Sequence, residues 1–343
     1  MRIAMATGWL LAALLITLLL VRSAIGYAHR RGMLDQPGQR RSHRLPTPRG
    51  GGIGIVVAML LCLLGEWWYL PGVFWSFGMV AGLSGALMLV ALAGWWDDHR
   101  SLPVLPRLAM QLLAVLGFSV ALLATGLSFW WLPLLLVGGV WSINLHNFMD
   151  GIDGLLAQQA IFVASGLAGL AWTAAEPMLA LAAATLAASA LGFWCYNHPP
   201  ARIFMGDVGS GSVGLLIFAF TAMLWRLRHD LLWPALTLSS AFVVDASLTL
   251  LTRMWRGRCW YAAHREHLYQ WLVRRGGSHA NADKGYLAWN LLVAAPLAWL
   301  ACSHLRLALP ITMAVYLLAA VLWLALKRRC LRRDLFKDGH VAT

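Results

Sequence analysis

Long runs of apolar residues alternate along the chain with short segments that hold most of its polar residues. Most runs approach or exceed about 18 residues, the length that an α-helix needs to cross a bilayer. The pattern predicts an all-α fold, a polytopic integral membrane bundle of about 11 transmembrane helices. We expect these helices at residues 3–25, 51–68, 75–95, 107–126, 130–146, 155–173, 178–195, 211–225, 231–250, 286–302 and 307–326.

The composition favours one membrane domain without a separate soluble part. Hydrophobic residues make up 60% of the chain and charged residues 12%, whereas soluble domains carry about 25% charged residues. We therefore expect residues 1–343 to form a single transmembrane domain. The first apolar run is longer than the core of a signal peptide, which has about 7–15 residues, so we expect it to be kept as the first helix.

Basic residues gather between alternate predicted helices. If the helices cross the membrane in turn, one face receives about 23 of the 27 Lys and Arg residues, while Arg226 and Arg228 fall on the other. By the positive-inside rule the basic face is cytoplasmic, which places the N-terminus outside and the C-terminus in the cytoplasm. The net charge of +13 suits anionic lipid headgroups, and we assign 327–343 to a basic cytoplasmic tail. We expect no nucleic-acid partner, because no binding motif for one accompanies the charge.

The few acidic residues gather on the same predicted face. The chain has only 14 Asp and Glu, and Asp97, Asp98, Asp150, Asp153 and Asp207 all fall at or near cytoplasmic helix ends. Carboxylates that lie together beside hydrocarbon repel each other and lose hydration, so they need a cation. Magnesium is suitable because it takes oxygen ligands, keeps several waters and commonly bridges carboxylates to substrate phosphates. We therefore expect a magnesium site on this face.

The segment "NLHNFMDGIDGLL" places Asn144, Asn147, Asp150 and Asp153 three residues apart. On a helix each such step turns by about 60°, so the first three residues share one face, which we expect to look into the bundle. An alternative is that Asp153 simply caps the helix predicted at 155–173. Capping does not account for all four polar residues at once.

Loops on the predicted cytoplasmic face suit phosphate. The segment "FMGDVGSGSVG" surrounds Asp207 with glycines at a helix start, where backbone N–H groups can approach an anion. Phe204 precedes it and is either a membrane-edge anchor or a surface for stacking a planar base. The segment "RRSHRLPTPRGGGIG", which includes Arg44, supplies guanidinium groups that bind phosphate oxygens two at a time.

A second basic loop, "YAAHREHLYQWLVRRGG", contains His264, Arg265 and His267. Two histidines three residues apart can share a helix face and donate to an oxyanion. A zinc site is the alternative, although the loop does not supply the remaining ligands. The simplest alternative is that these residues are only solvated positive charges of a cytoplasmic loop.

Together these pieces resemble the polyprenyl-phosphate N-acetylhexosamine-1-phosphate transferases, which include the bacterial translocase of peptidoglycan synthesis and the enzymes that start O-antigen. The resemblance extends over about two thirds of the chain, from His43 to Gln270. The form "AHREHLYQ" looks most like members that initiate lipopolysaccharide O-chains. The matching pieces are "HRLPTPRGGGIGIV", "DDHRS", "NLHNFMDGIDGL", "NHPPARIFMGDVGS" and "AHREHLYQ".

The resemblance implies a bacterial inner (cytoplasmic) membrane enzyme with its active site facing the cytoplasm. It would move an N-acetylhexosamine-1-phosphate from a UDP-sugar to undecaprenyl phosphate and release UMP. The reaction would depend on Mg²⁺, for which Mn²⁺ could substitute. The catalytic loops would be 26–50, 94–107, 144–156, 197–211 and 253–285. Downstream glycosyltransferases would take the product, and a homodimer is left open.

The family's residue roles can be transferred position by position. The resemblance implies Asp97, Asp98, His264 and His267 as catalytic residues. It implies Asp207 and Asn147 as metal ligands. It implies Asn144, Asp150, Asp153, Phe204, Arg265 and Arg44 as substrate-binding residues.

The chain departs from the family pattern at two places. Ser101 stands where many members have a third acid of a DDxxD motif, and "HREH" replaces a run of three histidines. Direct displacement by the lipid phosphate is the favoured route, and a two-step route through an aspartyl-phosphate remains open. Two other functions share some features: a membrane aromatic prenyltransferase with paired acid motifs, and an ion-coupled transporter with intramembrane acids.

Overall fold

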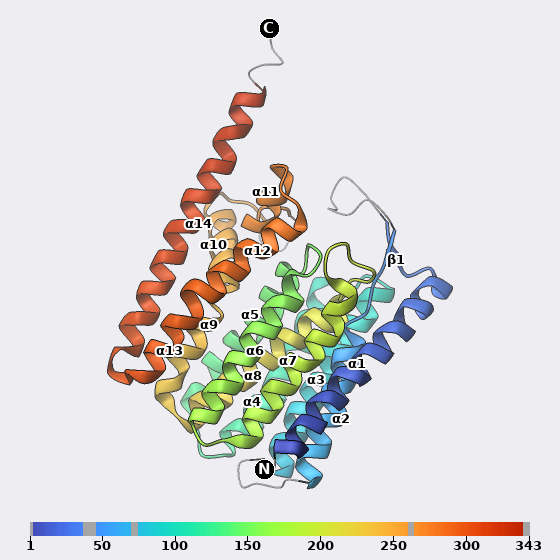
Figure 1. Ribbon diagram of the computed structural model, residues 1–343, viewed down its shortest axis with the longest axis vertical. Coiled ribbons are helices and arrows are strands. Elements are labelled where there is room, and N and C mark those ends of the chain that lie inside the picture. Colours follow the sequence, from blue (N-terminus) through green and yellow to red (C-terminus); the bar gives the residue numbers. More distant parts are fainter. Residues whose placement is uncertain (1–2, 37–45, 70–74, 260–263, 339–343) are drawn as a thin grey trace.

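The computed structural model describes residues 3–36, 46–69, 75–259 and 264–338 (Figure 1). Helices make up nearly all of this part of the chain, as expected from its apolar runs. The helices of the first half are α1 (Ile3–Arg31), α2 (Ile53–Tyr69), α3 (Phe77–His99), α4 (Val104–Leu123), η1 (Phe129–Trp131), α5 (Leu132–Met149) and α6 (Leu155–Thr173). Those of the second half are α7 (Pro177–Asn197), α8 (Asp207–Leu227), η2 (His229–Leu231), α9 (Leu232–Leu238), α10 (Ser240–Trp255), α11 (Leu268–Arg274), α12 (His279–Trp289), the π-helical turn η3 (Asn290–Ala294), α13 (Ala295–Ser303), η4 (Leu305–Leu307) and α14 (Ala308–Asp338).

The prediction of an all-α polytopic membrane bundle is confirmed. In the described part of the chain, nine helices are long and apolar enough to cross a membrane, and a bent pair, η2–α9 with α10, gives a tenth. The 17-residue helix α2 is apolar but shorter than these. The predicted number of about eleven is reached if α2 is counted as well.

One short pairing of strands was not expected. The two-residue strands β1 (Leu34–Asp35) and β2 (Thr47–Pro48) pair in antiparallel register, with Leu34 opposite Pro48. The segment before α8 pairs with β2 in turn, because Phe204 N–H donates to the carbonyl of Pro48 at 2.8 Å. The strands therefore hold the 46–52 segment against the loop that leads into α8.

Helix α8 is the central helix of the bundle. It is the most completely buried of the candidate spans and packs against α3 and α5. Small residues permit this close packing: a Cβ on Gly214 would lie 2.6 Å from the carbonyl oxygen of Ser142 in α5. The N-terminal end of α8, where Asp207 stands, is thus held from several sides.

The loops that follow α1, α3, α5 and α7 lie at the end of the bundle from which α14 projects (Figure 1). Arg226 and Arg228 lie at the other end, where Arg226 donates to the carbonyl of Thr125 and Arg228 lies 3.8 Å from Asp230. Arg226 and Arg228 are therefore exceptions to the charge pattern, as expected from the sequence, and the helices still alternate in direction. Lys327, assigned from sequence to a surface tail, is buried instead.

Candidate active site

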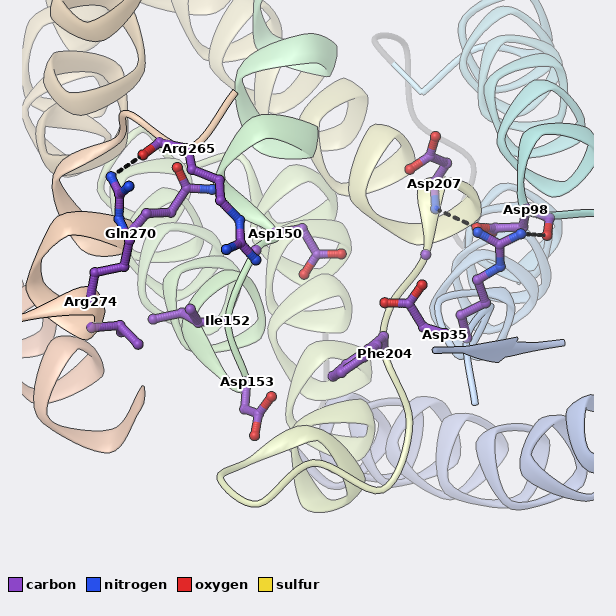
Figure 2. Close-up of a pocket in the computed structure, with 14 residues that line it drawn as sticks. Asp35, Asp98, Asp150, Ile152, Asp153, Phe204, Asp207, Arg265, Gln270 and Arg274 are labelled. Carbon is purple, nitrogen blue, oxygen red and sulfur yellow. Dashed lines mark hydrogen bonds between the residues drawn. The ribbon is translucent and has the colours of Figure 1, made fainter. Parts of the chain in front are cut away.

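A cavity of about 340 Å³ opens at the end of the bundle where the acidic loops meet. Figure 2 shows Asp98, Asp207 and Phe204 on one side of it, Arg265, Gln270 and Arg274 on the other, and Asp150 between them. The remaining lining residues are Asp35, Arg49, Gly151, Ile152, Asp153, Gly206 and Val273. The cavity therefore joins an acidic wall to a basic wall.

Asp98 holds the N-terminal end of α8. Its buried carboxylate accepts the backbone N–H of Asp207 at 3.1 Å and that of Val208 at 3.2 Å, two of the groups that a helix start leaves unpaired. The Arg49 guanidinium donates to the backbone carbonyl of Asp98. Gly206 has φ +74°, and a Cβ there would lie 2.6 Å from an Asp98 oxygen. Both oxygens of Asp98 are thus committed to positioning.

Asp207 and Asp97 form the acidic centre with Asn147 and Arg107. The Asn147 amide donates to Asp207 Oδ1 at 2.8 Å and to Ser210 Oγ at 3.0 Å. Arg107 Nη1 lies 3.1 Å from Asp97 Oδ2 and 3.7 Å from Asp207 Oδ2. The carboxyl groups of Asp97 and Asp207 are also within hydrogen-bonding reach of each other. Side chains from four helices, α3, α4, α5 and α8, therefore converge here, and Arg107 of α4 is the member not expected from sequence.

This group of side chains fits magnesium chemically. Two carboxyl groups in contact favour a cation between them, and carboxylate and amide oxygens are the ligands that Mg²⁺ prefers. Among the described residues, Arg107 lies against both carboxyl groups and compensates part of their negative charge. Within that part of the chain, no three His, Cys, Asp or Glu already stand at metal-binding spacing. The expected ligands Asp207 and Asn147 therefore remain a prediction.

Asp150 and Asp153 line the cavity but are held differently. Burial, followed by repulsion from Asp98 and Asp153, raises the pKa of Asp150 to about 7. Asp153 accepts the backbone N–H of Ala201 at 3.1 Å and lies 3.2 Å from His279 Nδ1. Gly154, not Asp153, stands at the cap position of α6. The capping alternative for Asp153 is therefore wrong, because its carboxylate joins the loops around the cavity.

The histidine loop divides between two environments. Arg265 lines the cavity, whereas His264 and His267 are not among its lining residues in the described chain. The His267 ring lies between Phe148 and Tyr269, with ring centroids 6.2 and 5.8 Å away. Burial lowers the pKa of His264 to about 4, and nearby His267 and Arg253 add to this effect. Burial also lowers the pKa of His267, so both imidazoles favour the neutral form.

Tyr269 fixes this loop against the acidic segment. Its hydroxyl donates to the carbonyl of Phe148 at 2.9 Å, and a Cβ on Gly151 would lie 2.0 Å from the same hydroxyl. Glycine is thus required where the loop touches the "DGIDG" segment. No zinc cluster of three or more suitable ligands forms around these histidines in the described residues.

Two predicted site residues, Asn144 and Arg44, do not line the main cavity in the described structure. Asn144 donates to Gln111 Oε1 at 2.7 Å and to the Val140 carbonyl at 2.8 Å, and it lines a cavity of about 20 Å³ together with Arg107, Asn147 and Asp207. Arg44 lies outside the described residues. Ser101 is exposed, and Asp97 accepts the backbone N–H of the following residue, Leu102, at 2.5 Å.

Sequence reasoning did not single out four lining or supporting residues: Arg49, Arg107, Gln270 and Arg274. Arg49 lies inside the quoted "HRLPTPRGGG" piece, so its motif was recognised without its role. Arg107 falls at the start of a predicted helix and carries no local motif. Its contact with Asp97 and Asp207 depends on how α4 packs beside α3.

A helix bundle with an acidic cavity rimmed by arginines, at one end of its membrane spans, defines a membrane enzyme for phosphorylated substrates. Comparison with known proteins identifies the class further. Residues 80–225 match the family model described as "Glycosyl transferase family 4". The chain belongs to this family, the polyprenyl-phosphate N-acetylhexosamine-1-phosphate transferases, whose members generally depend on magnesium.

Several curated relatives are similar over most of their length. A decaprenyl-phosphate N-acetylglucosaminephosphotransferase of Mycobacterium tuberculosis is 30% identical over 315 residues, covering 78% of this chain and 75% of the relative. A probable undecaprenyl-phosphate N-acetylglucosaminyl 1-phosphate transferase of Bacillus subtilis is 28% identical, with 79% and 76% covered. A phospho-N-acetylmuramoyl-pentapeptide-transferase of Lactiplantibacillus plantarum is 29% identical, with 71% and 81% covered.

Proposed function

We propose that this protein transfers N-acetylhexosamine-1-phosphate from a UDP-sugar to undecaprenyl phosphate. An oxygen of the lipid phosphate forms a bond to the sugar-linked phosphorus, the bond from that phosphorus to UMP breaks, and UMP leaves. The observation that carries the proposal is that Asp207, in contact with Asp97 and Asn147, lines the same cavity as Arg265 and Arg274. UDP-N-acetylglucosamine is the first sugar nucleotide to test, because two relatives are named for that sugar.

The residues of the acidic wall prepare the site for anions. Asp207, Asn147 and Asp97 would hold Mg²⁺, which when bound neutralises charge on the phosphates. Asp98 holds the start of α8 and so fixes the backbone that carries Asp207. Arg107 contacts both carboxylates of the centre and limits their repulsion. Positioning and charge neutralisation are the main requirements of phosphoryl transfer.

The opposite wall and the floor of the cavity bind the sugar nucleotide. Arg265 and Arg274 can bond diphosphate oxygens through their planar guanidinium groups. Phe204 offers a ring at the cavity edge on which uracil can stack. Direct displacement requires no enzyme-bound intermediate, and inversion of configuration at a chiral sugar-linked phosphorus would support it over the two-step route.

The cavity end of the bundle faces the cytoplasm of a bacterial inner membrane in this proposal. The sugar nucleotide is water-soluble, while the acceptor stays in the bilayer, so the site must lie at the membrane edge. The product would start O-antigen or a related envelope polysaccharide and pass to downstream glycosyltransferases on the same face. The "AHREHLYQ" form supports the O-antigen assignment.

Release of UMP tests this proposal. Purified protein with Mg²⁺, undecaprenyl phosphate and UDP-N-acetylglucosamine should form UMP and a lipid-linked diphosphate sugar in equal amounts. Parallel reactions with UDP-N-acetylgalactosamine and with 6-deoxy UDP-sugars define the sugar. Absence of UMP with every sugar nucleotide would contradict the function. The prenyltransferase and transporter alternatives receive no support from the family to which the chain belongs.

A further inference from the structure

Lys327 points into the bundle, unlike Arg328 and Arg329, which follow it directly. Its side chain is 7% exposed, whereas Arg328 and Arg329 are exposed. The ammonium nitrogen lies 4.1 Å from the ring centroid of Trp323 and has no hydrogen-bond partner among the described residues. The indole ring stabilises the charge in part. A buried ammonium without an acceptor is otherwise costly, so an anion is expected beside it.

The loop 264–267 supplies two imidazoles, each with a ring nitrogen that forms no hydrogen bond in the described chain. The Nδ1 atoms of His264 and His267 are buried without a hydrogen-bond partner in the described chain, and the two rings lie 4.9 Å apart. Burial is the largest cause that lowers the pKa of each histidine, and the charge of Lys327 lowers both further. Trp323, over which the ammonium lies, donates through Nε1 to Asp245 Oδ1 at 2.9 Å, and His267 Nδ1 lies 3.9 Å from the same oxygen. Lys327 and the histidine pair are therefore grouped around this carboxylate.

The carboxylates nearest to Lys327 are engaged with other groups. Asp245 accepts from the backbone N–H of Leu268, from Trp323 Nε1 and from the hydroxyls of Thr249 and Tyr286. Glu266 pairs with Arg253 and, at 3.0 Å, with Arg258. Neither carboxylate is hydrogen-bonded to the ammonium, so the missing acceptor comes from outside these residues.

The anion is lipid-linked rather than part of the sugar nucleotide. Lys327 stands near the end of the membrane-spanning part of α14, Leu305–Leu331. The cavity assigned to the sugar nucleotide has its own arginines and is not lined by Lys327. An apolar groove of about 120 Å³ between α10, α11, α12 and α14 reaches Trp323, the residue on which the ammonium lies. Leu268, Leu272 and Leu326 line the groove and suit an isoprenoid chain.

We propose that Lys327, with His264 and His267, binds the phosphate of the polyprenyl-phosphate acceptor while the adjoining groove takes part of its chain. The inference rests on the proposed function. The loop 264–267 would then contact both substrates, because Arg265 lines the sugar-nucleotide cavity (Figure 2), whereas His267 shares Asp245 with Trp323, over which the Lys327 ammonium lies. Lys327 thereby becomes a substrate-binding residue instead of a surface charge.

Steady-state kinetics of three variants test the site. Lys327→Met keeps the aliphatic stem and removes a buried charge, so it should fold at least as well as the natural protein. We expect its KM for undecaprenyl phosphate to rise about tenfold or more while its KM for the UDP-sugar changes less than about twofold. Lys327→Arg should restore most of the loss. Arg328→Met, which removes an exposed charge one residue away, should match the natural protein.

A binding experiment without turnover gives the second measurement. A fluorescent polyprenyl phosphate should bind the natural protein and be displaced by undecaprenyl phosphate, but not by phosphatidylglycerol in excess. Equal displacement by phosphatidylglycerol would show a site for bulk anionic lipid and overturn the proposal, as would unchanged binding by a folded Lys327→Met. Since this assay needs no UDP-sugar, its failure is distinguishable from a failure of UMP release.

Discussion

Asp97 and Asp98 are neighbours in sequence but do different work in the structure. Asp97 lies beside Asp207 and Arg107, at the acidic centre. Asp98 turns its carboxylate to the backbone at the start of α8, so it acts through Asp207. Successive residues of a helix point about 100° apart, which is why an acidic pair at a helix end divides between two roles.

Replacing Asp207 tests the acidic centre. Asp207→Asn keeps the size of the side chain and can still bond Asn147, but it removes a charged oxygen ligand. We expect the rate of UMP release to fall by about 100-fold or more and the Mg²⁺ concentration for half-maximal rate to rise. Asp230→Asn, exposed at the other end of the bundle, is the control and should leave both values unchanged. A near-normal rate with Asp207→Asn would rule out the metal assignment.

Asp150 predicts a dependence of stability on pH. Its pKa is about 7 in the folded protein, raised from 3.8. Between these two pH values the folded protein keeps a proton on Asp150 that the unfolded chain has lost. Stability therefore decreases as pH rises from about 4 through about 7. Asp150→Asn removes this loss. In Mg²⁺-free buffer it should be more stable than the natural protein at pH 8, by on the order of 1–2 kcal/mol, and the difference should vanish near pH 4.

Unfolding midpoints in detergent at pH 4, 6 and 8 would measure this difference. The natural protein and Asp150→Asn are compared at each pH. A constant difference between the two proteins over this range would contradict the raised pKa of Asp150.

At the scale of elements, close contacts between helices place the site residues. A Cβ on Gly94 of α3 would lie 2.3 Å from the carbonyl oxygen of Asp207, and a Cβ on Gly52 would lie 2.2 Å from the Cα of Gly209. Helices α3 and α8 and the turn that leads into α2 therefore meet through glycine at the level of the acidic centre. Such contact fixes the start of α8 without any long side chain.

Gly94→Ala tests this placement. The added methyl group must displace the backbone at Asp207, so we expect UMP release to fall about tenfold or more and stability to fall by about 1–3 kcal/mol. Gly85→Ala in the same helix is the matched control, because a Cβ there meets nothing within 4 Å. That control should keep its activity. Equal activity of both variants would show that the contact does not position Asp207.

At the scale of the whole molecule, charge is distributed between the two ends of the bundle. The described basic residues lie mostly at the cavity end, and Arg226, Arg228 and Arg306 lie at the other. By the positive-inside rule this asymmetry predicts that the cavity faces the cytoplasm. That orientation would give the proposed site access to a soluble sugar nucleotide.

Native cysteines can report this orientation. Cys259 is exposed at the cavity end, and Cys302 is partly exposed near the end of α13, 3.7 Å from the hydroxyl of Thr173. In variants that keep only one cysteine, a membrane-impermeant maleimide should label Cys259 in inside-out vesicles and not in intact cells. A variant that keeps only Cys302 should be labelled in intact cells and not in inside-out vesicles. Labelling of Cys259 in intact cells would show that the topology is the reverse of the proposed one.

The sequence determined the fold class, because the length of an apolar run alone decides whether a helix can cross a membrane. It also identified most residues of the acidic centre, since Asp207, Asn147 and Asp97 belong to motifs at helix ends. The unusual scarcity of charge made those residues conspicuous. Local signals of this kind depend on neighbours in the chain and are visible without coordinates.

Only the tertiary structure decided which side chains face the substrates. Arg107 reaches Asp97 and Asp207 from another helix, Asn144 turns to Gln111, and Lys327 turns inward although Arg328 and Arg329 beside it are exposed. The rotation and packing of each helix set these directions, and they depend on contacts between residues far apart in sequence. A motif therefore places a residue at the site, while helix packing determines what its side chain touches.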